Sequence, residues 1–153
     1  METKGGDMTR IDIQLELPHS IGHVWTRLTD WPSHSEWIPN TVVTVTRQTT
    51  GVGTEFVGVT HLGPLRLDDP MTVTESRPPK RGDASCVVTK TGLVLGGTAG
   101  FELTALNDSA TRLEWFEDVH LKPRTLFWWT APFVFAVGTI AFRSALNAFA
   151  RTL

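Results

Sequence analysis

The sequence predicts an α+β domain in which an antiparallel sheet of about seven strands packs against one long C-terminal helix. Three observations support this prediction. Six β-rich or alternating segments follow one another between residues 41 and 121, with short turns between them. One alternating segment and two short helical segments precede them. The last part of the chain, residues 124–153, has no charge between Arg124 and Arg143 and shows helical periodicity.

The C-terminal segment has a clear apolar face only in its second half, where Arg143, Asn147 and Arg151 occupy the opposite side. That face consists of Phe135, Phe142, Leu146, Phe149 and Leu153. In the first half, Phe133, Val137 and Ile140 place apolar groups on the opposite side as well. We expect a large apolar surface of the sheet to cover this helix. An ordinary core helix without a ligand role is the alternative.

The same segment raises the question of a membrane span. The uncharged run from Thr125 to Phe142 is near the lower length limit for a span. However, it contains Pro132 and Gly138 and lacks flanking clusters of basic residues. Removing the helix into a membrane would also leave one face of the sheet uncovered, so we expect no stable membrane span.

Length and composition favour a single soluble domain. At 153 residues and 41% hydrophobic content, the chain can bury one core, which we place in residues 10–153 after a disordered lead-in of residues 1–9. The lead-in has no apolar stretch typical of a secretory signal. A net charge of −2 without a Lys/Arg-rich run argues against a nucleic-acid partner. The single Cys86 excludes an internal disulfide and favours a cytoplasmic location.

The first elements follow from local patterns. Residues 10–17 alternate apolar and polar side chains, which predicts a half-buried strand that Pro18 ends. Ser20 can cap a short helix whose apolar residues Ile21, Val24, Trp25 and Leu28 have helical spacing. A second short helical turn is expected at residues 31–37, between prolines.

The remaining strands are predicted from β-branched content and turn residues. They cover residues 41–49, 54–61, 65–75, 84–91, 94–106 and 111–121. A proline- and glycine-containing loop is expected at residues 78–83. Gly96, Gly97 and Gly100 lack the strand-to-helix context of a phosphate loop, and we expect them to let the sheet bend.

The order of elements and several local motifs resemble a known superfamily. The motifs are the Val24-Trp25 helix after Pro18, the segment from Trp31 to Trp37-Ile38-Pro39, Gly51-Val52-Gly53-Thr54-Glu55-Phe56, Asp69-Pro70-Met71, Lys90-Thr91-Gly92, and Trp115 with Glu117-Asp118. Together they resemble the START-like, helix-grip superfamily, which includes the polyketide cyclase/dehydrase and lipid-transport family (SRPBCC). The resemblance covers roughly residues 10–150. It implies a curved sheet wrapped around the long helix, with an apolar cavity that binds lipids, sterols, polyketides or hormones. It implies no catalytic set, because catalytic residues vary in this family.

Three charged residues share strand faces with apolar ones. Asp69 alternates with Met71, Glu117 with Trp115, and Lys90 shares its face with Cys86. If these faces line the cavity, the three charges project into it and must pair or shift their pKa. Asp69 and Glu117 are therefore the candidate acid and base. The alternative is structural: a bulge at Pro70 turns Asp69 outward, Lys90 reaches solvent, and Glu117 anchors a loop.

Aromatic residues are the other candidates for ligand contact. Those that could form a cage are Trp37, Phe56, Phe101, Trp115, Trp128, Trp129, Phe133 and Phe135. Such residues more often form plain core, and only the resemblance favours a cavity. The predicted ligand-binding set is Trp37, Phe56, Met71, Lys90, Phe101, Trp115, Trp129 and Phe133.

Weaker signals point to no metal or cofactor. His19 and His23 have the spacing of two helical metal ligands, but no third ligand lies nearby in the sequence. Cys86 is expected to be a buried, inert thiol. A Gly-x-Ser-x-Gly elbow is absent from the sequence, which disfavours a serine hydrolase.

Three functions remain open at this stage. The first is binding or transport of a small hydrophobic, lipid-like or polyketide-like ligand between the sheet and the long helix. The second is a polyketide aromatase/cyclase or dehydratase in which Asp69 and Glu117 move protons. The third is a homodimer formed through the two-sided apolar stretch from Phe133 to Phe142.

Overall fold

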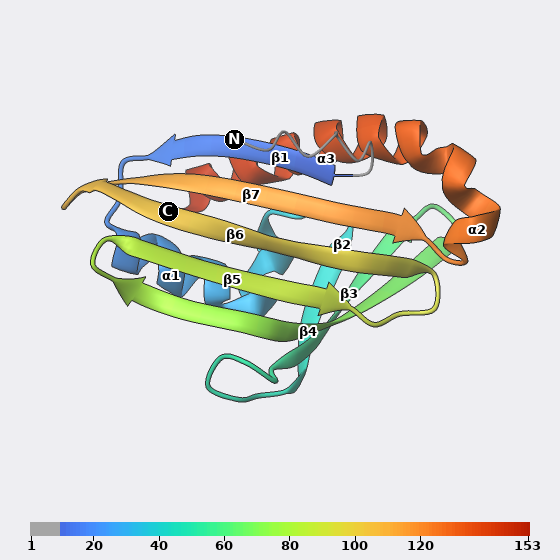
Figure 1. The fold of residues 1–153 in the computed structure, drawn as a ribbon, viewed down its shortest axis with the longest axis horizontal. Helices are drawn as coiled ribbons and strands as arrows, with labels where there is room; N and C mark the ends of the chain where they lie inside the picture. The colour runs from blue at the N-terminus through green and yellow to red at the C-terminus, as the bar shows by residue number, and fades with distance from the viewer. Residues whose placement is uncertain (1–9) are drawn as a thin grey trace.

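The chain forms one seven-stranded antiparallel sheet with its helices on one face (Figure 1). The computed structural model describes residues 10–153. The predicted lead-in, residues 1–9, lies outside this range. The strands are β1 (Arg10–Leu17), β2 (Thr41–Arg47), β3 (Glu55–Leu62), β4 (Leu65–Lys80), β5 (Asp83–Lys90), β6 (Leu95–Asn107) and β7 (Ala110–Leu121). Their order in the sheet is β1-β7-β6-β5-β4-β3-β2.

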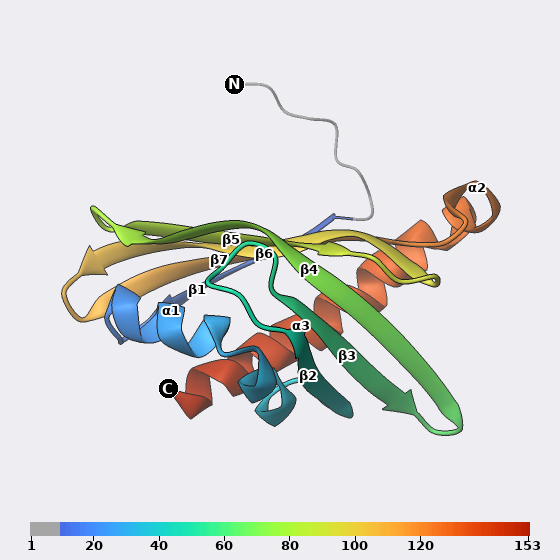
Figure 2. The same cartoon turned by 90° about the horizontal axis from the view of Figure 1, so that it is seen from below.

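The first helical segment connects the two edges of the sheet. Helix α1 (Ile21–Thr29) follows β1, and its N-cap Ser20 accepts a hydrogen bond from the His23 backbone N–H. The 3-10 helix η1 (Trp31–Glu36) then leads to β2, where the backbone N–H of Val43 donates to Ser35. Both segments lie under the concave face (Figure 2). The two short helices expected after the first strand are confirmed.

The C-terminal segment is broken into three pieces. A short helix α2 (Arg124–Phe127) and a 3-10 turn η2 (Trp128–Thr130) precede the long helix α3 (Ala131–Thr152). The second half of α3 lies under the sheet, with Ala145, Leu146 and Phe149 buried. Near its middle, α3 approaches β1 so closely that a Cβ at Gly138 would lie 2.6 Å from the Ile11 side chain. The expectation that a curved sheet grips this helix is confirmed for that half.

The first half of the C-terminal segment differs from the expectation. Its large apolar side chains are exposed to solvent instead of covered by the sheet. We call the set Leu126, Trp128, Trp129, Phe133, Val137 and Ile140 the exposed apolar surface; each member is at least 50% exposed. The reason for three of them is helical geometry, because Phe133, Val137 and Ile140 lie on the side of α3 opposite the buried Leu146 and Phe149. The sheet covers one side of α3, and no other element covers the opposite side in the part of the chain that the structure describes.

The expected loop at residues 78–83 is also wrong. Strand β4 continues to Lys80, and a two-residue turn of Arg81 and Gly82, both with positive φ, joins it to β5. The prolines at 78 and 79 lie at a register shift between Arg77 and Lys80. Proline is tolerated there because the shifted residues need not donate to the neighbouring strand.

By length and composition alone, Pro132–Thr152 could cross a membrane, with a mean hydropathy of 1.5 and 17% of the window buried. Its second half, however, supplies Leu146 and Phe149 to the core of this fold. A span would withdraw both side chains from the sheet.

Candidate functional site

A cavity of ≈ 120 Å³ lies between the concave face of the sheet and the helical segments. Its apolar wall includes Trp31, Ile38, Val43, Phe56, Met71, Val88, Phe101, Trp115 and Phe142. Small residues keep the centre open, because Gly58 and Ala99 place little or no side chain there. This pocket lies where the resemblance places an apolar cavity, between the sheet and the long helix.

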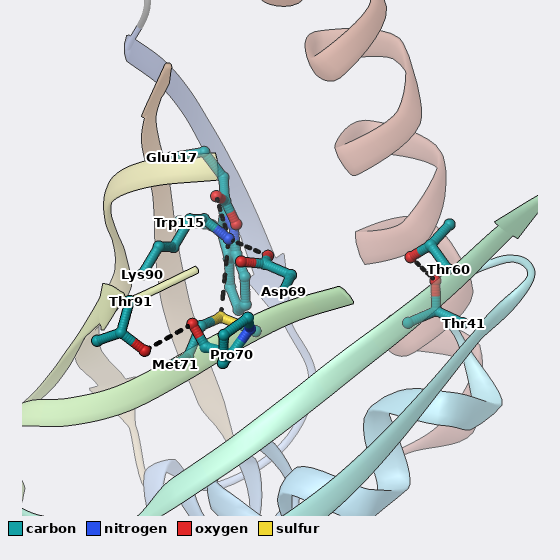
Figure 3. Close-up of polar contacts among 9 residues, drawn as sticks. All are labelled: Thr41, Thr60, Asp69, Pro70, Met71, Lys90, Thr91, Trp115 and Glu117. Carbon is teal, nitrogen blue, oxygen red and sulfur yellow. Dashed lines mark hydrogen bonds and ion pairs between the residues drawn. The ribbon is translucent and has the colours of Figure 1, made fainter. Parts of the chain in front are cut away.

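The strand register brings the three charged candidates to one side of this cavity. Lys90 pairs across the strands with Met71, and Glu117 pairs with Ala99. Asp69 lies two residues before Met71 on β4 and therefore on the same face. Figure 3 shows the three side chains converging from β4, β5 and β7. The alternation along each strand correctly predicted that they point inward.

Lys90 is the centre of this cluster. Its ammonium donates to Oδ2 of Asp69 at 2.6 Å, lies 3.9 Å from Oε2 of Glu117 and contacts the sulfur of Met71 at 3.7 Å. The lysine and glutamate side chains are only 5% and 4% exposed. The alternatives in which Lys90 reaches solvent and Asp69 turns outward are therefore wrong.

Burial and charge act on the two ends of the cluster in different ways. Burial raises the pKa of Glu117 to about 7, although the Lys90 charge and the Trp115 indole N–H act in the opposite direction. Burial alone would lower the pKa of Lys90, but the charges of Glu117 and Asp69 and the hydrogen bond to Asp69 outweigh it, and that pKa is raised. Lys90 is therefore a cation at neutral pH, while Glu117 exchanges a proton near neutrality.

Two carboxylate oxygens in the cluster lack hydrogen-bond partners among the residues that the structure describes. They are Oδ1 of Asp69 and Oε2 of Glu117, and both atoms are buried. The other oxygen of Glu117, Oε1, accepts from the Trp115 indole N–H at 3.3 Å. Buried acceptors are normally satisfied, so these two atoms indicate a place for a polar group of a ligand or for water.

A second polar point lies across the cavity, at Thr41 and Thr60. Their hydroxyls are 2.8 Å apart, and that of Thr41 also donates to the Pro39 carbonyl at 3.0 Å (Figure 3). Neither residue was among the predicted site residues. The alternation of Phe56, Gly58 and Thr60 along β3 was the signal that could have identified Thr60.

His34 is another lining residue that the sequence analysis did not single out. Its Nε2–H donates to the Leu28 carbonyl at 2.7 Å, and burial lowers its pKa to about 4. It is therefore a neutral imidazole at physiological pH. The spacing of Trp31, His34 and Trp37 by three residues, the period of a 3-10 helix, was the signal that could have identified it.

Of the other predicted ligand-binding residues, Phe56, Met71, Phe101 and Trp115 line the cavity. Trp37 is buried behind the lining, with its ring 6.1 Å from that of Trp115 and 5.2 Å from that of Phe149. Trp129 and Phe133 are 64% and 71% exposed and lie outside the lining. Their expected place in the cavity is wrong: Phe133 lies on the side of α3 that faces away from the sheet, and Trp129 lies in the turn η2 before α3.

The remaining chemical signals give no site. Burial raises the pKa of Cys86 to about 12, so its thiol is protonated and unreactive at neutral pH. The rings of His19 and His23 are 5.2 Å apart. Among residues 10–153, no group of three or more His, Cys, Asp and Glu side chains could hold a metal ion.

Neither a family model nor a curated protein matches the chain by sequence. Solved structures match its fold. The lipid transfer and protein localization domain of human StarD13 is 14% identical with a TM-score of 0.71, over 99% of this chain and 80% of that one. The Zhui aromatase/cyclase from Streptomyces sp. R1128 is 15% identical with a TM-score of 0.70, over 94% and 92%. A START superfamily protein from Mycobacterium smegmatis is 11% identical with a TM-score of 0.70, over 94% and 97%. The chain thus has the START-like, helix-grip fold of the polyketide cyclases and START domains.

Proposed function

We propose that this protein binds a small hydrophobic ligand in the cavity between the sheet and α3. The observation that carries the proposal is an apolar cavity with one buried charge cluster at its wall. Burial of apolar surface supplies affinity at about 25 cal/mol per Å², and a few polar groups fix orientation. The names of two structures with this fold, a lipid transfer domain and an aromatase/cyclase, support the same class of ligand.

The size of the cavity limits the ligand. A cavity of ≈ 120 Å³ is close to the engineered cavity of about 150 Å³ that binds benzene. Drug-sized ligands occupy pockets of about 300–1,000 Å³. The cavity, at the size seen in this structure, therefore has room for one ring or a short alkyl group. A complete lipid or polyketide would have to move the walls apart.

Native mass spectrometry of the freshly purified full chain tests the proposal. We expect a mass increment that disappears on denaturation and belongs to a molecule extractable into organic solvent. Delipidated protein should then recover the increment when the extract is added back. An extract that fails to rebind, together with no binding of single-ring compounds, would count against a ligand-binding function.

A second candidate function, proton-transfer catalysis on a polyketide-like substrate, rests on a separate observation. Glu117 has a pKa of about 7 inside the cavity and lies beside the Lys90–Asp69 ion pair. A carboxyl group that titrates near neutrality can both donate and accept a proton there. Asp69→Asn and Glu117→Gln should abolish turnover of a cyclisation or dehydration substrate and retain its binding. Unchanged binding by the variants, with no turnover found for the wild-type chain, would favour the binding function alone.

We also propose that the exposed apolar surface mediates self-association. Residues 125–142 carry no charge, and six of their large apolar side chains are at least half exposed. Contiguous apolar surfaces of this kind are uncommon on monomers and typical of interaction sites. A second copy of the chain would place two such surfaces against each other about a twofold axis.

A further inference from the structure

The cavity wall presents two hydrogen-bond acceptors to an otherwise apolar space. Oδ1 of Asp69 and Oε2 of Glu117 are buried and lack hydrogen-bond partners among residues 10–153. Glu117 is 3% exposed and lines the cavity together with Asp69. A buried acceptor without a donor is costly, so the cavity favours a ligand that donates a hydrogen bond to these oxygens.

The charged donor in the cluster cannot satisfy both atoms. The Lys90 ammonium already donates to the other oxygen of Asp69 at 2.6 Å, and it is 3.9 Å from Oε2 of Glu117, beyond hydrogen-bond distance. The Trp115 indole N–H likewise donates to the other oxygen of Glu117. Each carboxylate is therefore held in place through one oxygen and offers its second oxygen to the cavity.

We infer that the ligand of this cavity presents a hydroxyl group on a ring-sized apolar body to Asp69 and Glu117. The inference rests on the proposed ligand-binding function and specifies the polar end of the ligand. The hydroxyl donates to Oδ1 of Asp69, and its own oxygen lies next to Oε2 of Glu117. The ring occupies the space between Phe101, Trp115 and Met71.

The protonation behaviour of Glu117 distinguishes a hydroxyl from other polar groups. When Glu117 is ionised, Oε2 accepts; when it is protonated, Oε2 donates, because Oε1 already accepts from Trp115. A hydroxyl has one proton to donate and can also accept, so it satisfies both carboxyl groups when Glu117 is protonated and one of them when Glu117 is ionised. A carboxylate only accepts, and it would add a negative charge beside two carboxyl groups. An ammonium only donates, so it cannot accept from protonated Glu117, and it would place a second positive charge beside the Lys90 ammonium.

A matched set of four probes tests the inference on the full chain: phenol, toluene, benzoate and benzylamine. Phenol and toluene differ only by a hydroxyl in place of a methyl group. In calorimetry and ligand-observed NMR at pH 7, we expect phenol to bind at least tenfold more tightly than toluene, and toluene more tightly than benzoate. Glu117→Gln turns an acceptor into a donor and should reduce the preference for phenol over benzoate at least threefold.

The outcomes separate the inference from the function on which it rests. Equal binding of phenol and toluene, or tighter binding of benzoate or benzylamine than of phenol, would overturn the inference and leave a ligand-binding cavity. Failure of all four probes to bind would overturn both. If Glu117→Gln does not fold, the same comparison with the wild-type chain at pH 5 and pH 9 decides, because phenol should retain its advantage over toluene at both values.

Discussion

The Lys90 ammonium and Oδ2 of Asp69 are 2.6 Å apart in a wall where the lysine side chain is 5% exposed. One residue away on β4, Arg66 and Asp68 form a pair of similar length, 2.7 Å, with side chains that are 61% and 54% exposed. The two ion pairs therefore have similar lengths but contribute differently to stability. Water screens the second pair, whereas the first has no solvent to replace a missing partner.

Lys90→Met should destabilise the protein by about 3–5 kcal/mol at neutral pH, because it leaves Asp69 and Glu117 buried without their cation. Urea unfolding followed by circular dichroism measures the change. Arg66→Met is the matched control and should change stability far less than Lys90→Met does, since water screens its exposed pair. Similar losses of stability for the two variants would contradict the conclusion that burial makes the Lys90 ion pair more important than the exposed one.

Glu117→Gln should remove a pH dependence of stability. Burial raises the pKa of Glu117 from 4.5 to about 7. The folded state therefore holds this proton more tightly than the unfolded state does, and the favourable contribution is complete below pH 4.5 and lost as pH rises through 7. The shift corresponds to about 3 kcal/mol. The stability of the variant relative to wild type should rise between pH 4.5 and 7 and then level off; a constant difference would contradict the assignment.

His34 should act in the opposite direction over an overlapping range. Its pKa falls from 6.5 to about 4 on burial, so its contribution is complete above pH 6.5 and is lost as pH falls through 4. His34→Gln keeps an N–H donor for the Leu28 carbonyl and does not titrate. Relative to this variant, wild type should lose about 3 kcal/mol between pH 6.5 and 4. The stability of wild type must be compared with that of each variant, because the effects of the His34 and Glu117 titrations on stability partly cancel in wild type.

Gly58→Leu should block the cavity. A Cβ at Gly58 would meet Met71 and Thr41 at 3.7 and 3.8 Å, which are ordinary contacts, and the rest of the side chain would occupy the open space. Single-ring probes should then bind at least tenfold more weakly in calorimetry. Gly22→Leu on α1 is the control, because nothing lies within 4 Å of a Cβ there. Unchanged binding by the Gly58 variant would place the ligand elsewhere.

Phe133→Asp should shift the protein toward monomer in sedimentation experiments if the exposed apolar surface joins two copies. Leu65→Asp changes an equally exposed apolar residue, 69% against 71%, outside that surface and should leave the mass unchanged. A wild-type mass that is monomeric at every concentration would exclude the dimer. Binding of that monomer to neutral lipid vesicles would assign the surface to membranes instead.

The sequence predicted the order of elements because β alternation and turn residues are local signals. Strand β1 was predicted at its observed bounds, and the inward direction of Asp69, Lys90 and Glu117 followed from parity along each strand. Which strands neighbour each other is not local information. The 2.6 Å contact between Lys90 and Asp69 therefore needed the register of β4 with β5.

Two errors share a physical cause. The sequence shows that Trp129 and Phe133 are apolar, but apolarity is the same signal for a residue inside a cavity and for one on an exposed interaction surface. Their exposure depends on which side of the C-terminal segment faces the sheet, and long-range packing decides that. His34 and Thr41 were missed for the converse reason: a polar side chain in η1 or at the start of β2 gives no indication that other elements will enclose it.

Helix α3 is more deeply buried in its C-terminal half than in its N-terminal half. Leu146 and Phe149 are completely enclosed, whereas the side chains of Phe133 and Val137 are at least half exposed. Amide hydrogens should therefore exchange slowly in the last turns and quickly in the first ones. Phe142, which lines the cavity from this helix, lies between the two regimes. Bending of α3 near Phe142 would move its N-terminal turns away from the sheet and open the cavity to a ligand while the protein stays folded.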